Sequence, residues 1–324
     1  MSRMKLLSIF AAAGAVLFIL SACLPVVNHP GKQVSEPRID KDKFVAGDGS
    51  VLPVRSWLPI DRKVRAVIVG LHGFNDYSNF FAAPGSYLSG QGIASYSYDQ
   101  RGFGGAPGRG YWHGIEAYTN DLTCFVREIR KRHPGVPLYI LGESMGGAVT
   151  IVAMTGSNPP DADGVILVAP AVWGREAMPW YQRMLLAIAS HTFPWLELTG
   201  KGMGIKPSDN VEMLRALGRD PLVIKATRVD TLYGLTNLMD AALSRADRLQ
   251  LPTLVQYGEN DRIIPKKPTF LMLDKMPGST RKAFYKSGYH MLLRDRQGEK
   301  PLADIASWIG DHGIRLPYGK DSWQ

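Results

Sequence analysis

Cysteine is scarce in this sequence: Cys23 and Cys124 are the only two among 324 residues. Two cysteines allow at most one disulfide bond, which excludes a fold held together by several disulfides. Cys124 falls within a helical pattern at residues 118–132, and neither a base nor a tight turn lies beside it. We therefore expect Cys124 to fill apolar space rather than to act as a nucleophile.

Signatures of metal and nucleotide binding are also missing. No group of His, Cys, Asp and Glu residues has the spacing of metal ligands. The glycine-rich run at residues 99–105, Asp-Gln-Arg-Gly-Phe-Gly-Gly, does not match G-x-G-x-x-G, and no helical pattern opens directly after it. We interpret this run as a structural loop. The sequence thus predicts no metal and no cofactor.

Basic residues are in excess but are not concentrated. The 38 Lys and Arg against 29 Asp and Glu give a formal charge of +9, and they are scattered along the chain. Because no nucleic-acid motif accompanies them, we expect no nucleic-acid partner. The basic balance is compatible with a nearby anionic phospholipid surface or with an ordinary solvated exterior.

Long apolar runs are absent except near the N-terminus, where Arg3 and Lys5 precede an apolar run at residues 6–20. The run is too short for a comfortable membrane span and ends in small residues, which is typical of an export signal at residues 1–22. The ending Leu-Ser-Ala-Cys resembles the lipobox of bacterial lipoproteins, which implies that Cys23 is acylated and becomes the mature N-terminus. A plain secretory signal is the alternative.

The polar, proline-containing stretch that follows, residues 23–43, is expected to be a tether. With Cys23 acylated, the protein would be anchored in a membrane of the bacterial cell envelope and would face the periplasm or the exterior. Cys124 would then have no intramolecular disulfide partner.

From residue 44 onward, short apolar runs alternate with segments of helical period. The continuous apolar character of the short runs is typical of a parallel sheet that is buried on both faces. This order predicts an α/β domain at residues 44–313, with a mostly parallel central sheet flanked by helices, and a C-terminal tail at residues 314–324. The predicted strands are residues 64–71, 93–98, 138–141, 165–168, 253–257 and 282–286, and the predicted helices are residues 79–91, 114–133 and 145–154.

The alternation breaks between residues 169 and 252, a gap of about eighty residues that far exceeds the usual connection length. We expect an inserted helical cap at about residues 171–240. Its segment at residues 178–198 is rich in apolar and aromatic side chains. The periodicity is compatible with a lid over a site and equally with an ordinary packing helix.

Ser144 lies in the run Gly142-Glu143-Ser144-Met145-Gly146, between the predicted strand at residues 138–141 and a predicted helix. This setting is typical of the G-x-S-x-G turn, in which glycines two residues before and after the serine avoid a clash with neighbouring backbone. The helix N-terminus also favours negative charge that develops beside the serine. We predict that Ser144 is a nucleophile; an incidental glycine-rich turn is the alternative.

A serine hydroxyl needs a neighbouring base, and in folds with this motif the partners follow in the order serine, acid, histidine. Of the seven histidines, three follow Ser144. His191 lies in the insertion and His312 in the terminal segment, whereas His290 comes in the loop after the last predicted strand. We therefore predict His290 as the base.

The acid is expected after the predicted strand at residues 253–257, where the chain continues Gly-Glu-Asn-Asp. Asp261 is the preferred residue and Glu259 the competing carboxylate. Either would hold the imidazole in the correct tautomer and stabilise the imidazolium. An ordinary turn residue that bonds its own backbone is the alternative for both.

An oxyanion hole needs two backbone N–H donors, one from the residue after the nucleophile and one from the loop after an earlier strand. These are Met145 and, in the run Leu71-His72-Gly73-Phe74, Phe74. His72 precedes the serine in the chain, and we expect it to brace this loop by hydrogen bonding.

Several motifs together resemble the monoacylglycerol lipase and lysophospholipase branch of the α/β-hydrolases, in order, over roughly residues 44–309. The resemblance implies that Asp261 completes the triad and that the insertion forms a cap over an acyl-chain tunnel. Two positions differ, because Glu143 and Gln100 stand where the family often has histidine. The matching motifs are His72-Gly73-Phe74, residues 99–104, residues 142–147, Asn260-Asp261 and Gly288-Tyr289-His290.

The resemblance implies a serine ester hydrolase that cleaves a monoacylglycerol or a lysophospholipid through an acyl-enzyme on Ser144. An esterase or an amidase or aminopeptidase with a non-lipid substrate is the alternative within the fold. A non-catalytic binding lipoprotein on the same fold is a further one, although every candidate triad residue is present. The anchor and the cap together suggest that the cap faces the membrane and admits single-chain lipids from it.

Overall fold

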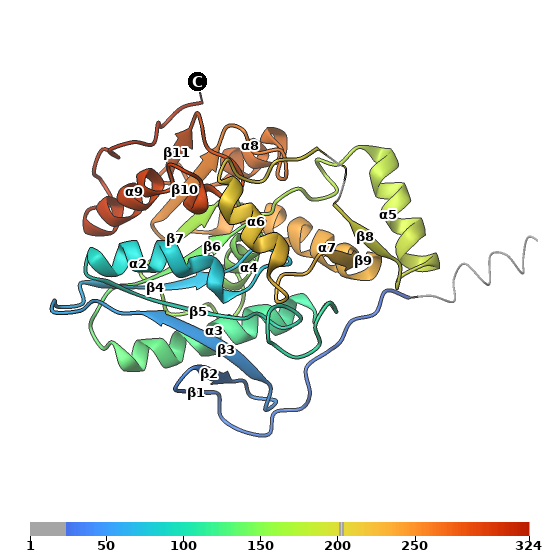
Figure 1. Ribbon diagram of the computed structural model, residues 1–324, viewed down its shortest axis with the longest axis horizontal. Helices are drawn as coiled ribbons and strands as arrows, with labels where there is room; N and C mark the ends of the chain where they lie inside the picture. The colour runs from blue at the N-terminus through green and yellow to red at the C-terminus, as the bar shows by residue number, and fades with distance from the viewer. Residues whose placement is uncertain (1–23, 201, 203, 324) are drawn as a thin grey trace, which may run out of the picture.

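The computed structural model describes residues 24–200, 202 and 204–323, so the predicted signal and Cys23 lie outside the described residues. A nine-stranded sheet forms its centre, with the strand order β1-β2-β3-β5-β4-β6-β7-β10-β11 (Figure 1). The pairs β1–β2, β2–β3 and β3–β5 are antiparallel, and the remaining pairs are parallel. The predicted α/β-hydrolase architecture with a mostly parallel sheet is confirmed.

The strands of this sheet are short, and those at its centre are buried along their whole length. Their continuous apolar runs reflect burial on both faces, since helices cover each side of the sheet. The strands are β1 (Arg38–Asp40), β2 (Lys43–Val45), β3 (Val51–Trp57), β4 (Ala66–Leu71), β5 (Ile93–Tyr98), β6 (Leu138–Glu143), β7 (Gly164–Val168), β10 (Thr253–Gly258) and β11 (Arg281–Tyr285).

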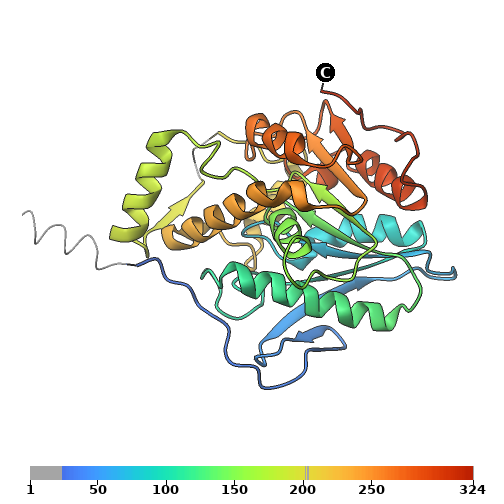
Figure 2. The ribbon, with the colours of Figure 1, turned by 180° about the vertical axis from the view of Figure 1, so that it is seen from behind.

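Helices pack on both faces of the sheet and produce two hydrophobic clusters. On one face lie α3 (Ile115–Arg132), α4 (Met145–Met154), α7 (Val229–Arg245) and α8 (Lys266–Lys275), of which α3, α4 and α7 are seen side by side in Figure 2. On the other face lie α2 (Ala82–Gly90) and α9 (Glu299–Gly310). Cys124 on α3 is a partly buried thiol that packs against the first cluster. Three short 3-10 helices, η1 (Ser78–Phe81), η2 (Ala246–Arg248) and η3 (Leu292–Arg294), complete the connections.

The chain between β7 and β10 carries α5 (Trp180–Thr192), β8 (Glu197–Thr199), α6 (Val211–Arg219) and β9 (Ala226–Arg228) before it enters α7. Strands β8 and β9 pair as a separate antiparallel ribbon. The expected end of the cap, residue 240, falls inside α7, which packs along α4 as part of the layer of helices. Among the described residues, no helix is long and apolar enough to cross a bilayer.

The expected tether, residues 23–43, is not free of the body along its whole described length. Strand β1 joins the edge of the sheet, and Val27 forms a parallel bridge with Trp112. Edge-strand pairing uses backbone groups, so it leaves no apolar period that sequence analysis could detect.

The expected C-terminal tail, residues 314–324, also lies on the body within its described part. Lys320 pairs with Phe284 of β11, and Leu316 is buried. The Trp323 ring lies 5.8 Å from that of Tyr257. The tail therefore covers the β11 edge of the sheet.

Candidate active site

Ser144 occupies the sharp turn between β6 and α4, with φ 53° and ψ −116°. A positive φ is strained for a residue with a side chain and persists only where the surroundings fix it. The Ser144 N–H donates to the Val168 carbonyl (3.0 Å), and the Ala171 N–H donates to the Ser144 carbonyl (2.9 Å). Strand β7 and the segment after it therefore hold the serine in this conformation.

The glycines on either side of Ser144 sit where no larger residue fits. A Cβ atom on Gly142 would lie 2.4 Å from the Gly146 carbonyl oxygen, and one on Gly146 would lie 2.3 Å from the Leu71 carbonyl oxygen. Both separations are far below contact distance. The G-x-S-x-G pattern is thus a steric requirement of the crossing between this turn and β4.

His290 and Asp261 meet in the loops that follow β11 and β10. The two atoms His290 Nδ1 and Asp261 Oδ2 lie 2.7 Å apart, and both residues are buried. The other oxygen, Asp261 Oδ1, accepts hydrogen bonds from the backbone N–H groups of Ile263 (2.8 Å) and Ile264 (3.0 Å). These bonds fix the carboxylate, so Asp261 orients the imidazole, and a His290 that donates through Nδ1 has Nε2 as its acceptor atom.

The charges around His290 determine its protonation. Burial opposes the imidazolium, but the charge and hydrogen bond of Asp261 together with the charge of Glu143 outweigh it, and Arg294 acts in the opposite sense. The net result is a raised pKa for His290. The imidazole is therefore a stronger base than an ordinary histidine.

The loop after β4 passes directly over Ser144. A Cβ atom on Gly73 would lie 3.3 Å from the Ser144 Cβ atom, which is closer than ordinary contact. Within the described part of the chain, the N–H of Phe74 makes no hydrogen bond. Met145 is the first residue of α4, so its N–H has no intrahelical acceptor.

His72 braces this loop, as predicted. Its Nδ1 donates to the Gly73 carbonyl (2.8 Å), and its Nε2 accepts from the Gln100 N–H (2.9 Å). The Gln100 side chain also donates to the His72 carbonyl (2.9 Å). Gln100, one of the departures from the family pattern, thus connects the loop after β5 to the loop after β4.

The other histidines considered for the base make different contacts. The His312 ring lies against Trp308, with ring centroids 4.5 Å apart and the planes tilted by 32°. His191 lies on α5, where its ring contacts Tyr233 edge-on. Neither contact involves the turn that carries Ser144.

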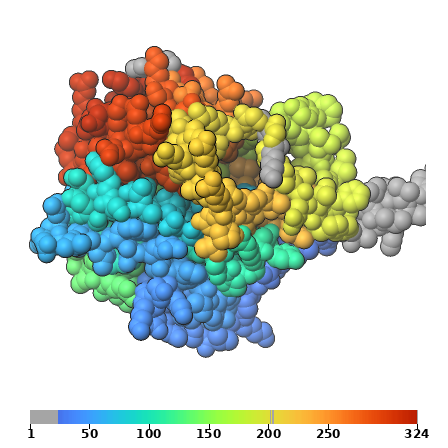
Figure 3. Space-filling view, in the orientation of Figure 1, coloured from blue at the N-terminus to red at the C-terminus, as the bar shows by residue number. Residues whose placement is uncertain are grey.

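The inserted segment covers the loops of the site. The Ile224 N–H donates to the Asn75 carbonyl (3.0 Å), next to Phe74, and the Met291 N–H, next to His290, donates to the Pro207 carbonyl (2.9 Å). Ser144 is only 7% exposed beneath this cover. The space-filling view is hollowed between the surfaces of α6 and α5 (Figure 3).

Helix α5 exposes apolar side chains instead of burying them. Trp180 is 70% exposed, Leu185 59% and Ile188 52%, and Ser190 is the sole buried residue of the helix. The alternative of an ordinary packing helix is therefore wrong. The helix ends at Thr192, because Pro194 disfavours helical backbone in the residue before it, Phe193.

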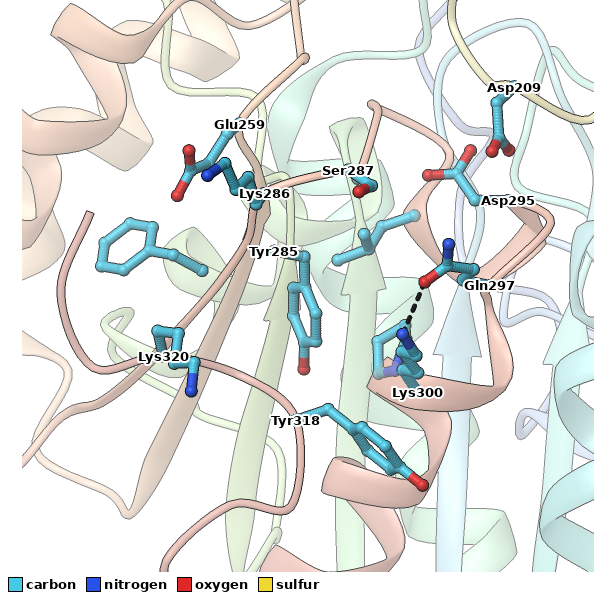
Figure 4. Close-up of a pocket in the computed structure, with 14 residues that line it drawn as sticks. Asp209, Glu259, Tyr285, Lys286, Ser287, Asp295, Gln297, Lys300, Tyr318 and Lys320 are labelled. Atoms are coloured by element: carbon cyan, nitrogen blue, oxygen red, sulfur yellow. Dashed lines mark hydrogen bonds between the residues drawn. The ribbon is translucent and has the colours of Figure 1, made fainter. Parts of the chain in front are cut away.

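A small cavity of about 190 Å³ lies beside the loop of His290 (Figure 4). Residues of both charge signs line it, among them Asp295, Lys300 and Lys320, and Lys300 donates to Gln297 there. Neither Ser144 nor His290 belongs to its lining. Its size and mixed charge do not suit an acyl chain. Among the described residues, no three His, Cys, Asp or Glu side chains are arranged to hold a metal.

A buried cation, Arg294, lies next to this site and was not predicted from the sequence. Arg294 Nη2 donates to Glu143 Oε1 (2.7 Å), and Arg294 Nη1 lies 2.8 Å from Asp76 Oδ2. The three residues are far apart in the sequence. The single available signal was Glu143 in place of the histidine that is frequent in the family.

Similar proteins include the monoacylglycerol lipase of Mycolicibacterium smegmatis, 27% identical over 82% of this chain and 96% of that protein. The monoglyceride lipase of Rattus norvegicus is 27% identical over 84% of this chain and 91% of that protein. A crystal structure of a soluble variant of the Saccharomyces cerevisiae monoglyceride lipase has a TM-score of 0.71 at 21% identity, and the match covers 89% of this chain and all of that one.

These relatives and the fold define the class: the protein is a serine ester hydrolase of the lipase type, similar to monoacylglycerol lipases. Within this class, the chain belongs to the family Hydrolase_4, described as serine aminopeptidase S33, whose model matches residues 62–297. The family assignment predicted from the motifs is confirmed.

Proposed function

We propose that Ser144, His290 and Asp261 form the catalytic triad of this ester hydrolase. The observation that carries the proposal is the buried 2.7 Å contact between His290 Nδ1 and Asp261 Oδ2, made by two loops at the same edge of the sheet as the strained Ser144. His290 Nε2 removes the proton as Ser144 Oγ attacks the ester carbonyl, and the same proton passes to the departing alcohol. Water then attacks the acyl-enzyme, with His290 again as the base.

The oxyanion formed in each step is held by the backbone N–H groups of Phe74 and Met145. Support comes from their position: Phe74 follows Gly73, where an added Cβ would lie 3.3 Å from Ser144 Cβ, and Met145 begins α4. Donors that are already oriented stabilise the developing charge without reorganisation. The dipole of α4 adds to this effect.

The proposed substrate is a single-chain lipid ester, a monoacylglycerol or a lysophospholipid. The monoacylglycerol lipases among the relatives support it, as does the exposed apolar face of α5, which we define as Trp180, Tyr181, Met184, Leu185 and Ile188. In this proposal the part of the inserted segment that precedes α7, residues 171–228, is the cap that receives the acyl chain. The apolar face of α5 contacts the lipid surface from which the substrate comes.

The proposal includes an acylated Cys23 as the anchor in a bacterial envelope membrane. The described chain begins beside β8, β9 and one end of α5 in both ribbon views, so an anchor attached there and the apolar face would lie near one another (Figures 1 and 2). Replacing Cys23 by serine should release the protein from the membrane fraction. Unchanged partitioning of the Cys23→Ser protein would remove the anchor from the proposal.

The test of the triad uses a fluorophosphonate probe and a panel of esters. The wild-type protein should be labelled at Ser144 and should hydrolyse monoacylglycerols, whereas Ser144→Ala should lose both properties. Hydrolysis that survives in Ser144→Ala would refute the proposed nucleophile. Rates over a series of acyl chain lengths would define the substrate.

Amide hydrolysis is a second candidate, since the family description names a serine aminopeptidase. The same triad cleaves amides when the leaving amine is protonated by the histidine. Rates on aminoacyl amides measured beside the ester panel decide between the two. A higher kcat/KM on an aminoacyl amide than on any monoacylglycerol would favour the second candidate.

A further inference from the structure

Three buried charges meet next to Ser144. Arg294 forms ion pairs with Asp76 (2.8 Å) and with Glu143 (2.7 Å), and each of the three side chains is at most 7% exposed. The Arg294 guanidinium also lies over the Phe80 ring, 5.7 Å from its centroid. We call these three charged residues the buried ion cluster.

The three members of the buried ion cluster come from three separate segments of the proposed active site: Glu143 ends β6, Asp76 lies in the loop after β4, and Arg294 ends η3. Glu143 immediately precedes Ser144, Asp76 follows Phe74 by two residues, and Arg294 follows His290 by four. One guanidinium therefore joins the turns that carry the proposed nucleophile, the proposed oxyanion donor and the proposed base.

The oxyanion loop depends on Asp76 for its shape. The Asp76 N–H donates to the Gly73 carbonyl (3.3 Å) and closes the turn that contains Phe74, while Asp76 Oδ1 accepts from the Tyr77 N–H (2.9 Å). A Cβ atom on Gly73 would lie 3.9 Å from Glu143 Oε1, so the Glu143 side chain lies under the same turn. A displacement of Arg294 would therefore release Phe74 relative to Ser144.

Stability alone is a weak reason for such an arrangement. Burying charges costs several kcal/mol for each ion, and apolar replacements of buried ion pairs are often neutral or stabilising. What the planar guanidinium adds is one terminal nitrogen for each carboxylate, with a hydrogen bond to Glu143 and an ion pair with Asp76. That property suits a group that sets the relative positions of separate loops.

We propose that Arg294 is a positioning residue, which uses Glu143 and Asp76 to fix the nucleophile turn, the oxyanion loop and the histidine loop relative to one another. This inference rests on the proposed function of Ser144 and His290. Arg294 acts through these groups and does not itself contact the reacting atoms.

The charges of the buried ion cluster also affect the pKa of His290. The pH dependence of activity can therefore be measured in addition to protein stability. The charged groups around His290 are Asp261 from the loop after β10, Glu143 from β6 and Arg294 from η3. Glu143 raises the pKa of His290, and Arg294 lowers it. Removing one or the other should move the acid limb of the pH–rate profile in opposite directions.

The experiment compares Arg294→Met, Arg294→Lys and Glu143→Gln with the wild-type protein on a soluble short-chain p-nitrophenyl ester. We expect Arg294→Met to lower kcat by about 100-fold with little change in KM, because small displacements of positioned groups have effects of this size. Arg294→Lys should recover part of the loss, since it keeps the charge without the fork. Arg296→Met, an exposed arginine two residues away, is the matched control and should leave kcat unchanged.

The pH profiles separate positioning from mere folding. The acid limb should move to higher pH in Arg294→Met and to lower pH in Glu143→Gln. A kcat of Arg294→Met equal to that of the wild-type protein overturns the proposal. The proposal is also overturned if the acid limbs of both variants stay at the wild-type pH and activity falls only in proportion to the fraction of folded protein. If Arg294→Met fails to fold, Glu143→Gln tests the proposal: its acid limb must move to lower pH.

Failure of the proposed function would look different. In that case the wild-type protein would escape the fluorophosphonate probe, or Ser144→Ala would stay active. Neither result depends on Arg294. Both are measured before the Arg294 variants.

Discussion

The Asp261 carboxylate is held by backbone hydrogen bonds in addition to its contact with His290. Its two oxygens accept from the imidazole and from two backbone N–H groups, so the carboxylate holds its position without help from the substrate. We expect Asp261→Asn to lower kcat by about 10⁴-fold, because an amide favours the wrong imidazole tautomer. Steady-state kinetics on a soluble ester measure the effect.

Glu259→Gln is the matched control for Asp261→Asn. Glu259 was the competing carboxylate in the sequence, and it lies only partly buried just after β10. Its replacement should leave kcat within about twofold of the wild-type value, because Asp261 is the carboxylate that contacts His290. Equal losses in the two variants would contradict the assignment of the acid.

The raised pKa of His290 predicts where activity is lost on acidification. The imidazolium cannot accept the Ser144 proton, so kcat/KM should fall as the pH drops through a value above the ordinary 6.5. A folded-state pKa that is raised adds stability at low pH, and this contribution disappears as the pH rises through the pKa. The acid loss of activity should therefore occur without unfolding, which circular dichroism at each pH checks. An acid limb below pH 6.5 would contradict the prediction.

Asp295 makes a separate, testable contribution to stability. Burial raises its pKa from 3.8 to about 6, against the hydrogen bonds from Ser208 Oγ and the Tyr289 N–H. The folded protein thus keeps a proton that the unfolded chain releases, so stability is complete below about pH 4 and falls as the pH rises towards 6. Asp295→Asn should raise the free energy of unfolding at pH 7.5 by about 1 kcal/mol, a value reduced for partial solvent screening.

Denaturant unfolding at two pH values tests this prediction. The gain in Asp295→Asn should appear at pH 7.5 and vanish near pH 4, where both side chains are neutral. Asp274→Asn, an exposed carboxylate at the end of α8, should change neither value. A gain that is equal at both pH values would mean that Asn improves packing instead.

At the scale of elements, the turn between β6 and α4 depends on glycine for space. Gly146→Ala would push a methyl group to 2.3 Å from the Leu71 carbonyl oxygen and force β4 and α4 apart. We expect a loss of about 1 to 3 kcal/mol in the free energy of unfolding, as for overpacked sites, together with loss of activity. Thermal and denaturant unfolding measure it.

Gly218→Ala on α6 is the opposite case. Nothing lies within 4 Å of a Cβ atom built there, and the residue is within a helix. Alanine should therefore stabilise the protein by up to about 1 kcal/mol. A stability change of the same sign in both glycine variants would show that local space does not decide the outcome.

Helices and strands could be predicted from the sequence where they depend on local patterns, and they were missed where they depend on contacts between distant segments. The central strands and α4 were visible because burial on both faces leaves continuous apolar runs, and Ser144 because its turn needs glycine at fixed positions. Strands β1 and β2 were missed because three-residue edge strands are held by backbone groups. The part of α7 that packs on α4 was assigned to the cap because its period resembles that of any apolar helix.

Most contacts between distant segments could not be predicted, because no local sequence pattern indicates them. A contact between His290 and a carboxylate after β10 could be expected, because parallel strands place their following loops at one edge of the sheet, and the family resemblance favoured Asp261 over Glu259. The bond from Ser208 Oγ to Asp295 Oδ1 (2.6 Å) joins the inserted segment to the histidine loop. No local pattern announces it. Arg294 is a similar case, since its partners lie at the end of β6 and in the loop after β4.

At the scale of the whole molecule, exposed apolar side chains lie at both ends of the sheet, but only one end carries the inserted segment that we propose to contact lipid. The inserted segment follows the carboxyl end of β7, and α5 exposes its apolar face there, with Trp180 70% exposed. The loop between β3 and β4 lies at the opposite end, where β4 begins, and carries Ile60 at 81% exposure. Both positions are exposed, so polar replacements should leave folding unchanged.

If the apolar face of α5 contacts a lipid surface, Trp180→Gln combined with Leu185→Gln should weaken binding to phosphatidylcholine vesicles by at least about tenfold, because each large side chain loses more than 1 kcal/mol of burial. The comparison is made in the Cys23→Ser protein, so that no lipid anchor masks the loss. Hydrolysis of vesicle-borne monoacylglycerol should fall with binding, while hydrolysis of a soluble short-chain ester should not. Ile60→Gln is the control and should alter neither rate. Equal vesicle binding by the α5 variant and the Ile60→Gln control would mean that the apolar face serves another partner, and the route of the substrate from the membrane would then be wrong.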